Sequence, residues 1–164
     1  MGLNFLGQMG IALALGLAAI GSAIGIGRAG IAAAGAWGKE AKAGKGLRFT
    51  YMILVALPLS QTLYAMIIMN KMRDGMTWLL STSPGISLPV AGVFLGIGIA
   101  AGLGEMFSAW MQGLVGAAGC RAMSEGEGKG LAFILIAMGI VETVGIFTFV
   151  LLLGVFNKFV DVPK

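Results

Sequence analysis

The chain has 164 residues, 58% of them hydrophobic and 11% charged, with a mean hydropathy of +0.95 and a formal net charge of +4. Soluble domains carry charge on about a quarter of their residues, so this composition indicates a membrane protein and excludes a water-covered globular domain. One cysteine and no histidine exclude a disulfide framework and a zinc site, and no basic face with interleaved aromatic residues points to nucleic acid.

Four apolar blocks follow one another along the chain, at residues 10–37, 48–70, 88–120 and 131–157. Each is longer than the roughly 20 residues that a helix needs to cross the hydrocarbon core. None alternates in the manner of a barrel strand, and backbone groups in lipid are then satisfied only within helices. We therefore predict an all-α membrane protein with four transmembrane helices.

The first block is rich in glycine, and its sequence "GIGRAG" at 25–30 matches a dinucleotide-binding fingerprint. No strand precedes this sequence, so helix packing is the better interpretation. The following polar segment, "GKEAKAGKG" at 38–46, has the wrong glycine spacing for a phosphate-binding loop. We therefore expect no nucleotide site. Arg28 lies in the other hairpin from the fourth block, and we expect it to extend to lipid phosphates.

The second block carries a polar stripe in the sequence "VALPLSQTLYA". Leu57, Ser60, Gln61 and Tyr64 fall at i, i+3, i+4 and i+7, so they share one face of a helix. Pro58 has no N–H and loosens the turn around Leu57, which exposes backbone oxygen. Three polar side chains and the Leu57 position on one stripe indicate half of a binding site.

The third block contains Gln112, an amide near the middle of the membrane, which alone is more typical of an interhelical hydrogen bond than of a ligand. Glu105 lies seven residues earlier, hence on the same face and about 10 Å farther from the 121–130 loop. Ser108 lies between them. Glu105 could line an exit path for the ion, pair with a cation, or be a protonated acid at an interhelical contact, and we expect the last of these.

Glu142 is the strongest functional signal in the sequence, because it lies 11 residues into the fourth block with 15 still to follow. A charged side chain at that depth costs about 2.5–3.5 kcal/mol even on the lenient insertion scale, and such residues are functional by default. The alternative is a protonated glutamic acid that bonds a neighbouring helix.

The four blocks form two related hairpins. The sequence "GKGL" occurs at 44–47 and again at 128–131, each time before the second helix of a pair. The first block together with the adjoining Gly38 has eight glycines and the third block also has eight, whereas the second has none and the fourth has three. We predict tandem duplicated hairpins of one orientation, residues 1–70 and 88–164, joined by an extracytoplasmic connection at 71–87.

Glycine lets helices approach closely, so the first and third helices require crowded surroundings that four helices alone do not supply. The leucine-, isoleucine- and phenylalanine-rich second and fourth helices suit a position against lipid. We therefore predict a homo-oligomeric ring of identical subunits, with the glycine-rich helices inside. An ordinary four-helix bundle is the alternative.

The polar groups in the membrane are one carboxylate, two amides, a hydroxyl and a phenol, from Glu142, Gln61, Gln112, Ser60 and Tyr64. One negative charge among neutral oxygens suits a desolvated monovalent cation, whereas a divalent ion requires more carboxylates. Sodium needs several converging oxygens and a proton needs few, so the inventory favours Na+, with H+ as the alternative.

The sequences "LPLSQTLY", "MQGLVGAAG" and "VET" together resemble the rotor-ring proteolipids of V-type and A-type ATPases. The resemblance covers essentially the whole chain and is closest to the 16-kDa K subunits of bacterial sodium-translocating V-ATPases. The sodium ligands that it implies are Glu142, Gln61, Ser60, Gln112 and the backbone oxygen of Leu57. It also implies that Tyr64 donates a hydrogen bond to the glutamate; Ser60 stands where relatives have threonine.

The function that the resemblance implies is a rotor subunit that is not an enzyme by itself. A stator subunit with a membrane arginine would release the ion, and a central-stalk subunit would contact the polar loops while a soluble head turns over ATP. The loops at 38–46 and 121–130, with Arg48, hold six of the eleven basic residues. This charge bias favours cytoplasmic loops and outside termini in a cell membrane.

Two other functions are compatible with a single membrane carboxylate. A small secondary transporter would use Glu142 for its substrate or proton, but it does not explain why glycine is concentrated in two of the four helices. A structural or channel-forming protein leaves the polar stripe of the second block without a role. Both remain alternatives at the level of the sequence.

Overall fold

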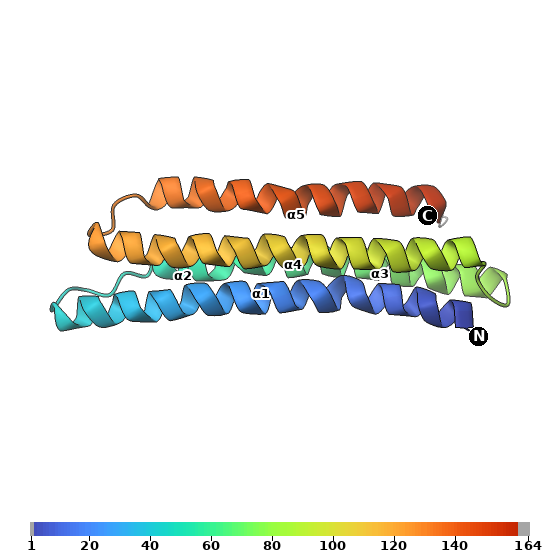
Figure 1. Ribbon diagram of the computed structural model, residues 1–164, viewed down its shortest axis with the longest axis horizontal. Helices are drawn as coiled ribbons and strands as arrows, with labels where there is room; N and C mark the ends of the chain where they lie inside the picture. The colour runs from blue at the N-terminus through green and yellow to red at the C-terminus, as the bar shows by residue number, and fades with distance from the viewer. Residues whose placement is uncertain (1, 161–164) are drawn as a thin grey trace.

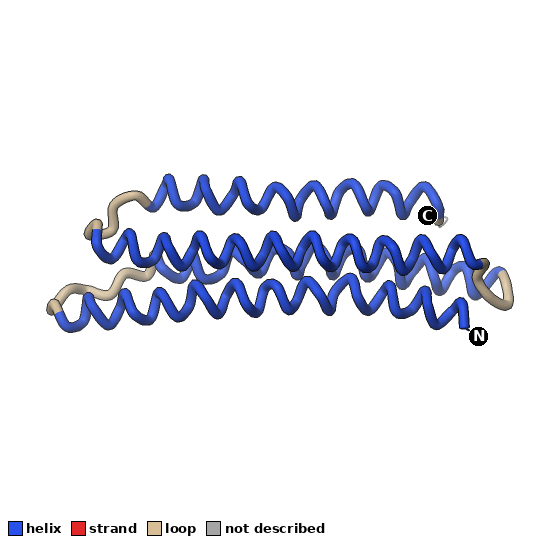
Figure 2. Tube along the Cα trace, viewed as in Figure 1, coloured by secondary structure: helices blue, strands red, loops and turns tan. Residues whose placement is uncertain are grey.

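The computed structural model describes residues 2–160 and is built from helices joined by short loops (Figures 1 and 2). Its elements are α1 (Gly2–Lys42), α2 (Tyr51–Ala56), the 3₁₀ turn η1 (Leu57–Leu59), α3 (Ser60–Thr82), α4 (Leu88–Glu125) and α5 (Leu131–Phe159). With α2, η1 and α3 taken as one unit, four helices are long and apolar enough to cross a membrane. No strand occurs between residues 2 and 160, and the all-α prediction is confirmed.

The helices form two hairpins that point the same way. In Figure 1, α1 and α4 run in one direction, and α3 and α5 run in the other. The loops that follow α1 and α4 lie together at one end of the molecule, and the link between the hairpins lies at the opposite end (Figure 2). The first glycine of each "GKGL" sequence has a positive φ, 64° at Gly44 and 90° at Gly128. The predicted common orientation of the two hairpins is confirmed.

The helices extend beyond the apolar blocks that predicted them. The connection between hairpins is much shorter than the predicted 71–87, because α3 continues to Thr82 and only residues 83–87 lack helix. The polar side chains of Lys71, Arg73 and Asp74 end the apolar pattern, but all three project from a continuous helix. Hydropathy therefore marks where the chain leaves the hydrocarbon layer, and not where the helix ends.

Helices α1 and α4 pack along their length through glycines. A Cβ atom on Gly98 would overlap the Gly10 backbone, and one on Gly113 would overlap the Gly25 backbone. We call these four residues the glycine seam. Because no side chain separates the two backbones there, they approach more closely than two ordinary helices can.

Other glycines of α1 face away from the subunit. Gly16, Gly27 and Gly38 are exposed and have no atom within 4 Å of a Cβ built on them. They recur every 11 residues, which is about three helical turns, so they lie on one side of α1. We call this the open glycine face. Within one subunit, other helices thus pack closely against only one side of α1, although close packing on nearly all sides was predicted.

Two apolar clusters fill the two halves of the bundle. One, toward the chain ends, includes Ile68, Phe94 and Phe156, and the two phenylalanine rings meet edge to face at 5.3 Å. The other, toward the loops, includes Leu54 and Met138. The buried polar side chains of α3 and α4 lie in sequence between these clusters, so the polar layer is enclosed by hydrocarbon on both sides.

Polar contacts hold the loop end together. Glu40 is almost fully buried, accepts a hydrogen bond of 2.6 Å from the Tyr51 hydroxyl and pairs with the Arg48 guanidinium. The Lys45 ammonium contacts Glu127 at 2.9 Å and thereby links the loops of the two hairpins. This hydrogen bond lowers the pKa of the exposed Glu127 carboxyl. The loop end is therefore fixed by one buried ion pair and by the exposed Lys45–Glu127 pair, with a longer exposed contact of 3.9 Å between Lys39 and Glu125 beside them.

Candidate ion-binding site

The polar layer begins at the 3₁₀ turn η1. Pro58 cannot donate a backbone hydrogen bond, and the chain tightens there so that the Ser60 N–H bonds to the Leu57 carbonyl. The Pro58 carbonyl in turn accepts a hydrogen bond of 2.6 Å from Ser22 Oγ of α1. The turn around Leu57 is therefore tightened into a 3₁₀ turn and not loosened as predicted, and the Ser22 hydroxyl of α1 bonds to it.

Three oxygen atoms lie close together at the start of α3. Ser60 Oγ is 3.0 Å from the Leu57 carbonyl oxygen and 3.1 Å from Gln61 Oε1. One atom comes from the backbone, one from a hydroxyl and one from an amide. The stripe read from the sequence therefore presents converging neutral oxygens, which are the ligands that a hard cation prefers.

Glu142 of α5 completes the layer from the other side. Its Oε1 accepts a hydrogen bond of 3.1 Å from the Tyr64 hydroxyl, and its Oε2 accepts one of 3.3 Å from Gln112 Nε2. Gln61 Nε2 donates to Gln112 Oε1 at 3.2 Å, which joins the two sides. The structure thus brings together all six residues singled out in the sequence, and we call them the Glu142 cluster: Leu57, Ser60, Gln61, Tyr64, Gln112 and Glu142.

Burial differs within the Glu142 cluster. Gln61 and Gln112 are fully buried, whereas Glu142 is only partly buried. The carboxylate is therefore the member nearest the outer surface, with the amides behind it. An ion held there would be enclosed by protein and still lie close to the face that α5 presents.

Sequence reasoning missed several groups that support the cluster. Ser108 Oγ accepts a hydrogen bond from Gln61 Nε2 and donates one to the Val141 carbonyl, both at 3.2 Å. Ser108 precedes Gln112 by four residues, so its shared helix face could have revealed it. The role of Ser22 could not be found in this way, because its partners Pro58 and Thr62 lie on another helix.

Glu105 and Arg28, whose roles the sequence left open, take different positions. Glu105 is fully buried at an interhelical contact, where its Oε2 lies opposite Gly145 of α5. Arg28 is exposed on α1 and takes part in no salt bridge with the part of the chain that the structure describes. The interhelical position expected for Glu105 is thus observed, and Arg28 does not replace an ion at Glu142.

The chemistry of the Glu142 cluster is that of one carboxylate among neutral oxygens. Within residues 2–160 no group of three or more histidine, cysteine, aspartate or glutamate side chains could hold a metal ion. A monovalent cation or a proton suits one carboxylate, because either one neutralises the single charge.

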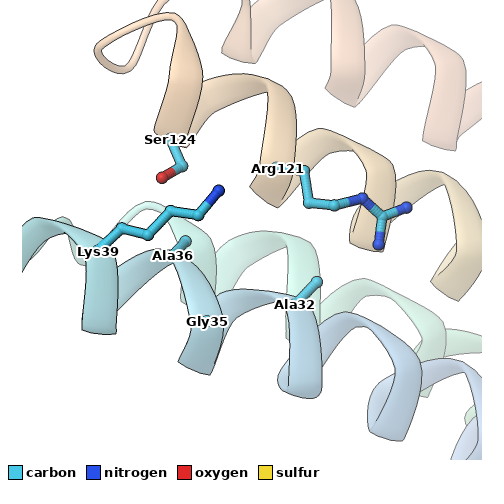
Figure 3. A pocket seen from close by; sticks show the side chains of 6 residues that line it. All are labelled: Ala32, Gly35, Ala36, Lys39, Arg121 and Ser124. Atoms are coloured by element: carbon cyan, nitrogen blue, oxygen red, sulfur yellow. The ribbon is translucent and has the colours of Figure 1, made fainter.

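A pocket of about 180 Å³ between α1 and α4 has the opposite character (Figure 3). Figure 3 shows Lys39 extending from α1 toward α4, and Arg121 projecting from α4 nearby. The lining residues are Ala32, Gly35, Ala36, Lys39, Arg121 and Ser124. Two basic side chains and no acid make this pocket unfavourable for a cation.

The four apolar helices form two hairpins of the same orientation, and the Glu142 cluster lies between them. These features define a multi-pass membrane protein with an internal duplication. The chain belongs to the ATP synthase C-subunit family, whose model matches it twice, at residues 9–70 and 95–153. The two matches correspond to the two hairpins, so the predicted duplication is confirmed. A comparison with curated proteins finds no significant match.

Membership of this family makes the chain an ion-translocating membrane proteolipid of a rotary ATPase rotor. Such proteolipids act as a ring of identical copies within the ATPase complex and are not catalytic themselves. The prediction of a rotor subunit is confirmed at this level. Which ion the rotor carries depends on the chemistry of the Glu142 cluster.

Proposed function

We propose that this protein is the K-type rotor subunit of a V-type ATPase and that it carries Na+ on Glu142. The observation that carries the proposal is that the Leu57 carbonyl oxygen and Gln61 Oε1 both lie within hydrogen-bond distance of Ser60 Oγ, at 3.0 and 3.1 Å. Through Gln112 these oxygens belong to the same hydrogen-bonded cluster as Glu142. The alternative is a proton-carrying rotor of the same family.

The number of oxygens favours sodium. A proton on Glu142 needs only the carboxylate and one hydrogen-bond partner, and Tyr64 already supplies that partner at 3.1 Å. Sodium loses its hydration shell on entering the membrane, and several protein oxygens must replace that shell. The Leu57, Ser60 and Gln61 oxygens have no such use in a proton site.

Sodium binding would change the orientation of one amide. Gln112 now donates its Nε2 hydrogens to Glu142 and to the Met138 carbonyl, at 3.3 and 3.2 Å. As a sodium ligand its side chain would turn to present Oε1 instead. The Tyr64 hydrogen bond to the other carboxylate oxygen is compatible with either orientation, so Glu142 itself need not move.

The exposed surfaces of one subunit suit a ring in which α1 lies inside and α5 lies outside. The open glycine face of α1 suits the inner wall of the ring, where neighbouring copies pack closely. Large apolar side chains are exposed along α5 and suit lipid, among them Phe133, Ile140, Phe147 and Leu151. A stator subunit with a membrane arginine would approach Glu142 from this outer side.

The loops would provide the contact with the central stalk. The basic residues Lys39, Lys42, Lys45, Arg48, Arg121 and Lys129 are concentrated at or near the loops after α1 and α4. By the charge bias of membrane proteins these loops face the cytoplasm, and both chain ends face outside.

Sodium-protected labelling of the assembled ring by a carbodiimide tests the proposal. The reagent reacts with a protonated carboxyl in an apolar setting, so sodium at Glu142 should slow the reaction near neutral pH. Because protons and sodium compete for one carboxylate, more sodium should be needed as the pH falls. If sodium at any concentration leaves the rate unchanged, the ring carries protons and the sodium proposal is wrong.

Amide variants locate the ligands in the same assay. Gln61→Leu and Gln112→Leu should raise the sodium concentration needed for protection and leave the reaction without sodium intact. Gln8→Leu removes an exposed amide of α1 far from the cluster and is the matched control. If the control changes protection as much as Gln61→Leu does, the amides act on assembly rather than on the ion.

A further inference from the structure

Glu105 is a carboxylate that the Glu142 cluster leaves without a role. It is fully buried in α4, and neither of its oxygens has a hydrogen-bond partner within residues 2–160. An ionised carboxylate without partners is among the costliest groups to place inside a membrane. Its position therefore requires a bound cation of some kind, at least for part of the working cycle.

The fold leaves space for this carboxylate on the facing helix. A Cβ atom on Gly145 of α5 would lie 2.7 Å from Glu105 Oε2 and 3.1 Å from Ser108 Oγ. Gly145 is itself buried, and the Glu105 carboxylate occupies the position that a side chain at residue 145 would take. Glu105 and Ser108 thus both lie against Gly145 of α5, and no hydrogen bond joins them.

Ser108, which lies beside Gly145 as Glu105 does, is hydrogen-bonded to the Glu142 cluster. Gln61 Nε2 donates to Ser108 Oγ and to Gln112 Oε1, each at 3.2 Å. Gln112 then donates to Glu142 Oε2. Hydrogen bonds therefore run from the partly exposed carboxylate of α5 as far as Ser108, and the buried Glu105 lies next to the end of this chain without being bonded to it.

No positive charge faces Glu105. The ionisable side chains that face it are Tyr64 from α3 and Glu142 from α5, and α1 has no ionisable side chain between residue 2 and Arg28. Both facing groups are neutral or negative. The cation at Glu105 must therefore come from outside the protein.

We propose that Glu105 is a second cation-binding carboxyl, which takes up a proton and releases it as the occupancy of the Glu142 cluster changes. Ser108 Oγ is the oxygen shown beside Glu105 Oε2 at the Gly145 position, and neither Glu105 oxygen has a hydrogen-bond partner within residues 2–160. A proton needs one acceptor, whereas sodium needs several converging oxygens in place of its hydration shell.

Ser108 is suited to accept that proton's hydrogen bond. A hydroxyl has one donor and two acceptor positions. Ser108 already donates to the Val141 carbonyl and accepts from Gln61, which leaves one acceptor position free. A protonated Glu105 that donates to Ser108 Oγ would satisfy both groups.

The charge of Glu142 controls the uptake and release of the proton at Glu105. When Glu142 is ionised without its ion, a second negative charge nearby is unfavourable, and Glu105 keeps its proton. When a cation neutralises Glu142, this repulsion disappears and Glu105 can release its proton. This coupling rests on the proposed role of Glu142, but it applies whichever monovalent cation Glu142 carries.

Infrared spectroscopy of the purified ring tests the proposal, because the C=O stretch of a protonated carboxyl reports each titration directly. Three rings are compared: the wild type, the Glu142→Gln variant, and the double variant Glu105→Gln/Glu142→Gln. Exposed carboxyls are the same in all three, so they cancel when one spectrum is subtracted from another. The Glu142→Gln ring should retain one buried titrating carboxyl, which the double variant should lose. Identical titrations in these two rings would overturn the proposal.

Adding sodium to the wild-type ring at constant pH should reduce the Glu105 band, and the same addition to Glu142→Gln should not. A Glu105 band that stays constant when sodium protects Glu142 from labelling would overturn the coupling. If sodium protects nothing, the sodium proposal fails, and the titration in the Glu142→Gln ring still decides the role of Glu105.

The Ser108→Ala variant serves where Glu105→Gln yields no ring. In the Glu142→Gln background it removes the acceptor of the Glu105 proton, so the midpoint of the remaining titration should move to lower pH. An unchanged midpoint would show that the remaining signal does not come from Glu105 and would overturn the proposal.

Discussion

The hydroxyl of Tyr64 on α3 and the carboxylate of Glu142 on α5 are joined by a hydrogen bond of 3.1 Å across 78 residues of sequence. The Tyr64 ring also stacks on Phe149 of α5, with ring centroids 5.4 Å apart. One side chain of the first hairpin is thus packed on, and hydrogen-bonded to, the helix of the second hairpin that contains Glu142. The position of the carboxylate depends on both hairpins.

Tyr64→Phe tests this relationship, because it keeps the stacked ring and removes only the hydroxyl. The ionised Glu142 loses a donor, so its protonated form becomes relatively more stable. A hydrogen bond to a charged group contributes about 1.5–3 kcal/mol, so sodium affinity should fall about tenfold or more. The sodium concentration that half-protects Glu142 from a carbodiimide measures this, and an unchanged value would show that the bond is incidental.

Carbodiimide modification should occur at Glu142 and not at Glu105. Glu142 is partly exposed toward the outer face, whereas Glu105 is fully buried behind α5, where a bulky reagent cannot reach it. Mass spectrometry of peptides from the labelled ring identifies the modified residue. Dominant labelling of Glu105 would move the ion site two turns along α4 and undo the role given to Gln112.

Glycines of the two faces should fail in different ways when replaced. Gly98→Leu places a side chain into the Gly10 backbone and should prevent the two hairpins of one subunit from packing. Gly16→Leu meets no atom of its own subunit and should leave the subunit folded but block ring closure. Native mass spectrometry in detergent distinguishes these results; rings of normal size from Gly16→Leu would exclude the open glycine face from the contacts between neighbouring copies.

The two ion pairs at the loop end should differ in their effect on stability. Arg48→Ala leaves the carboxylate of the almost fully buried Glu40 without its cation, and it should lower the melting temperature of the ring by several degrees. Lys45→Ala breaks the exposed pair with Glu127 and should change it little. Equal shifts in circular dichroism melting curves would mean that water reaches Glu40 in the assembled ring.

The sequence was sufficient for those residues whose cost in a membrane is high. Glu142, Gln61 and Gln112 each interrupt an apolar block, and a polar group in hydrocarbon is present only where a partner or a ligand satisfies it. The helical spacing of Leu57, Ser60 and Tyr64 also placed three more groups on one face. All six lie in one cluster.

Other parts depended on packing that no single helix encodes. The contact between Glu105 and Gly145 requires a particular rotation of α5 against α4, and a glycine in a membrane helix has no distinctive chemistry to predict it. The length of α3 was missed for a different reason. Residues 71–82 are polar enough to leave the membrane, yet they still satisfy their backbone groups by continuing the helix.

The glycine seam also has a geometric consequence for the rotor. Side chains can adjust their rotamers to absorb a small error in spacing, but two backbones in direct contact at Gly10 and Gly98 cannot. The spacing of α1 and α4 within each subunit is thus set by main-chain contact. Any change at the seam would alter the width of every copy in the ring at once, because all copies are identical.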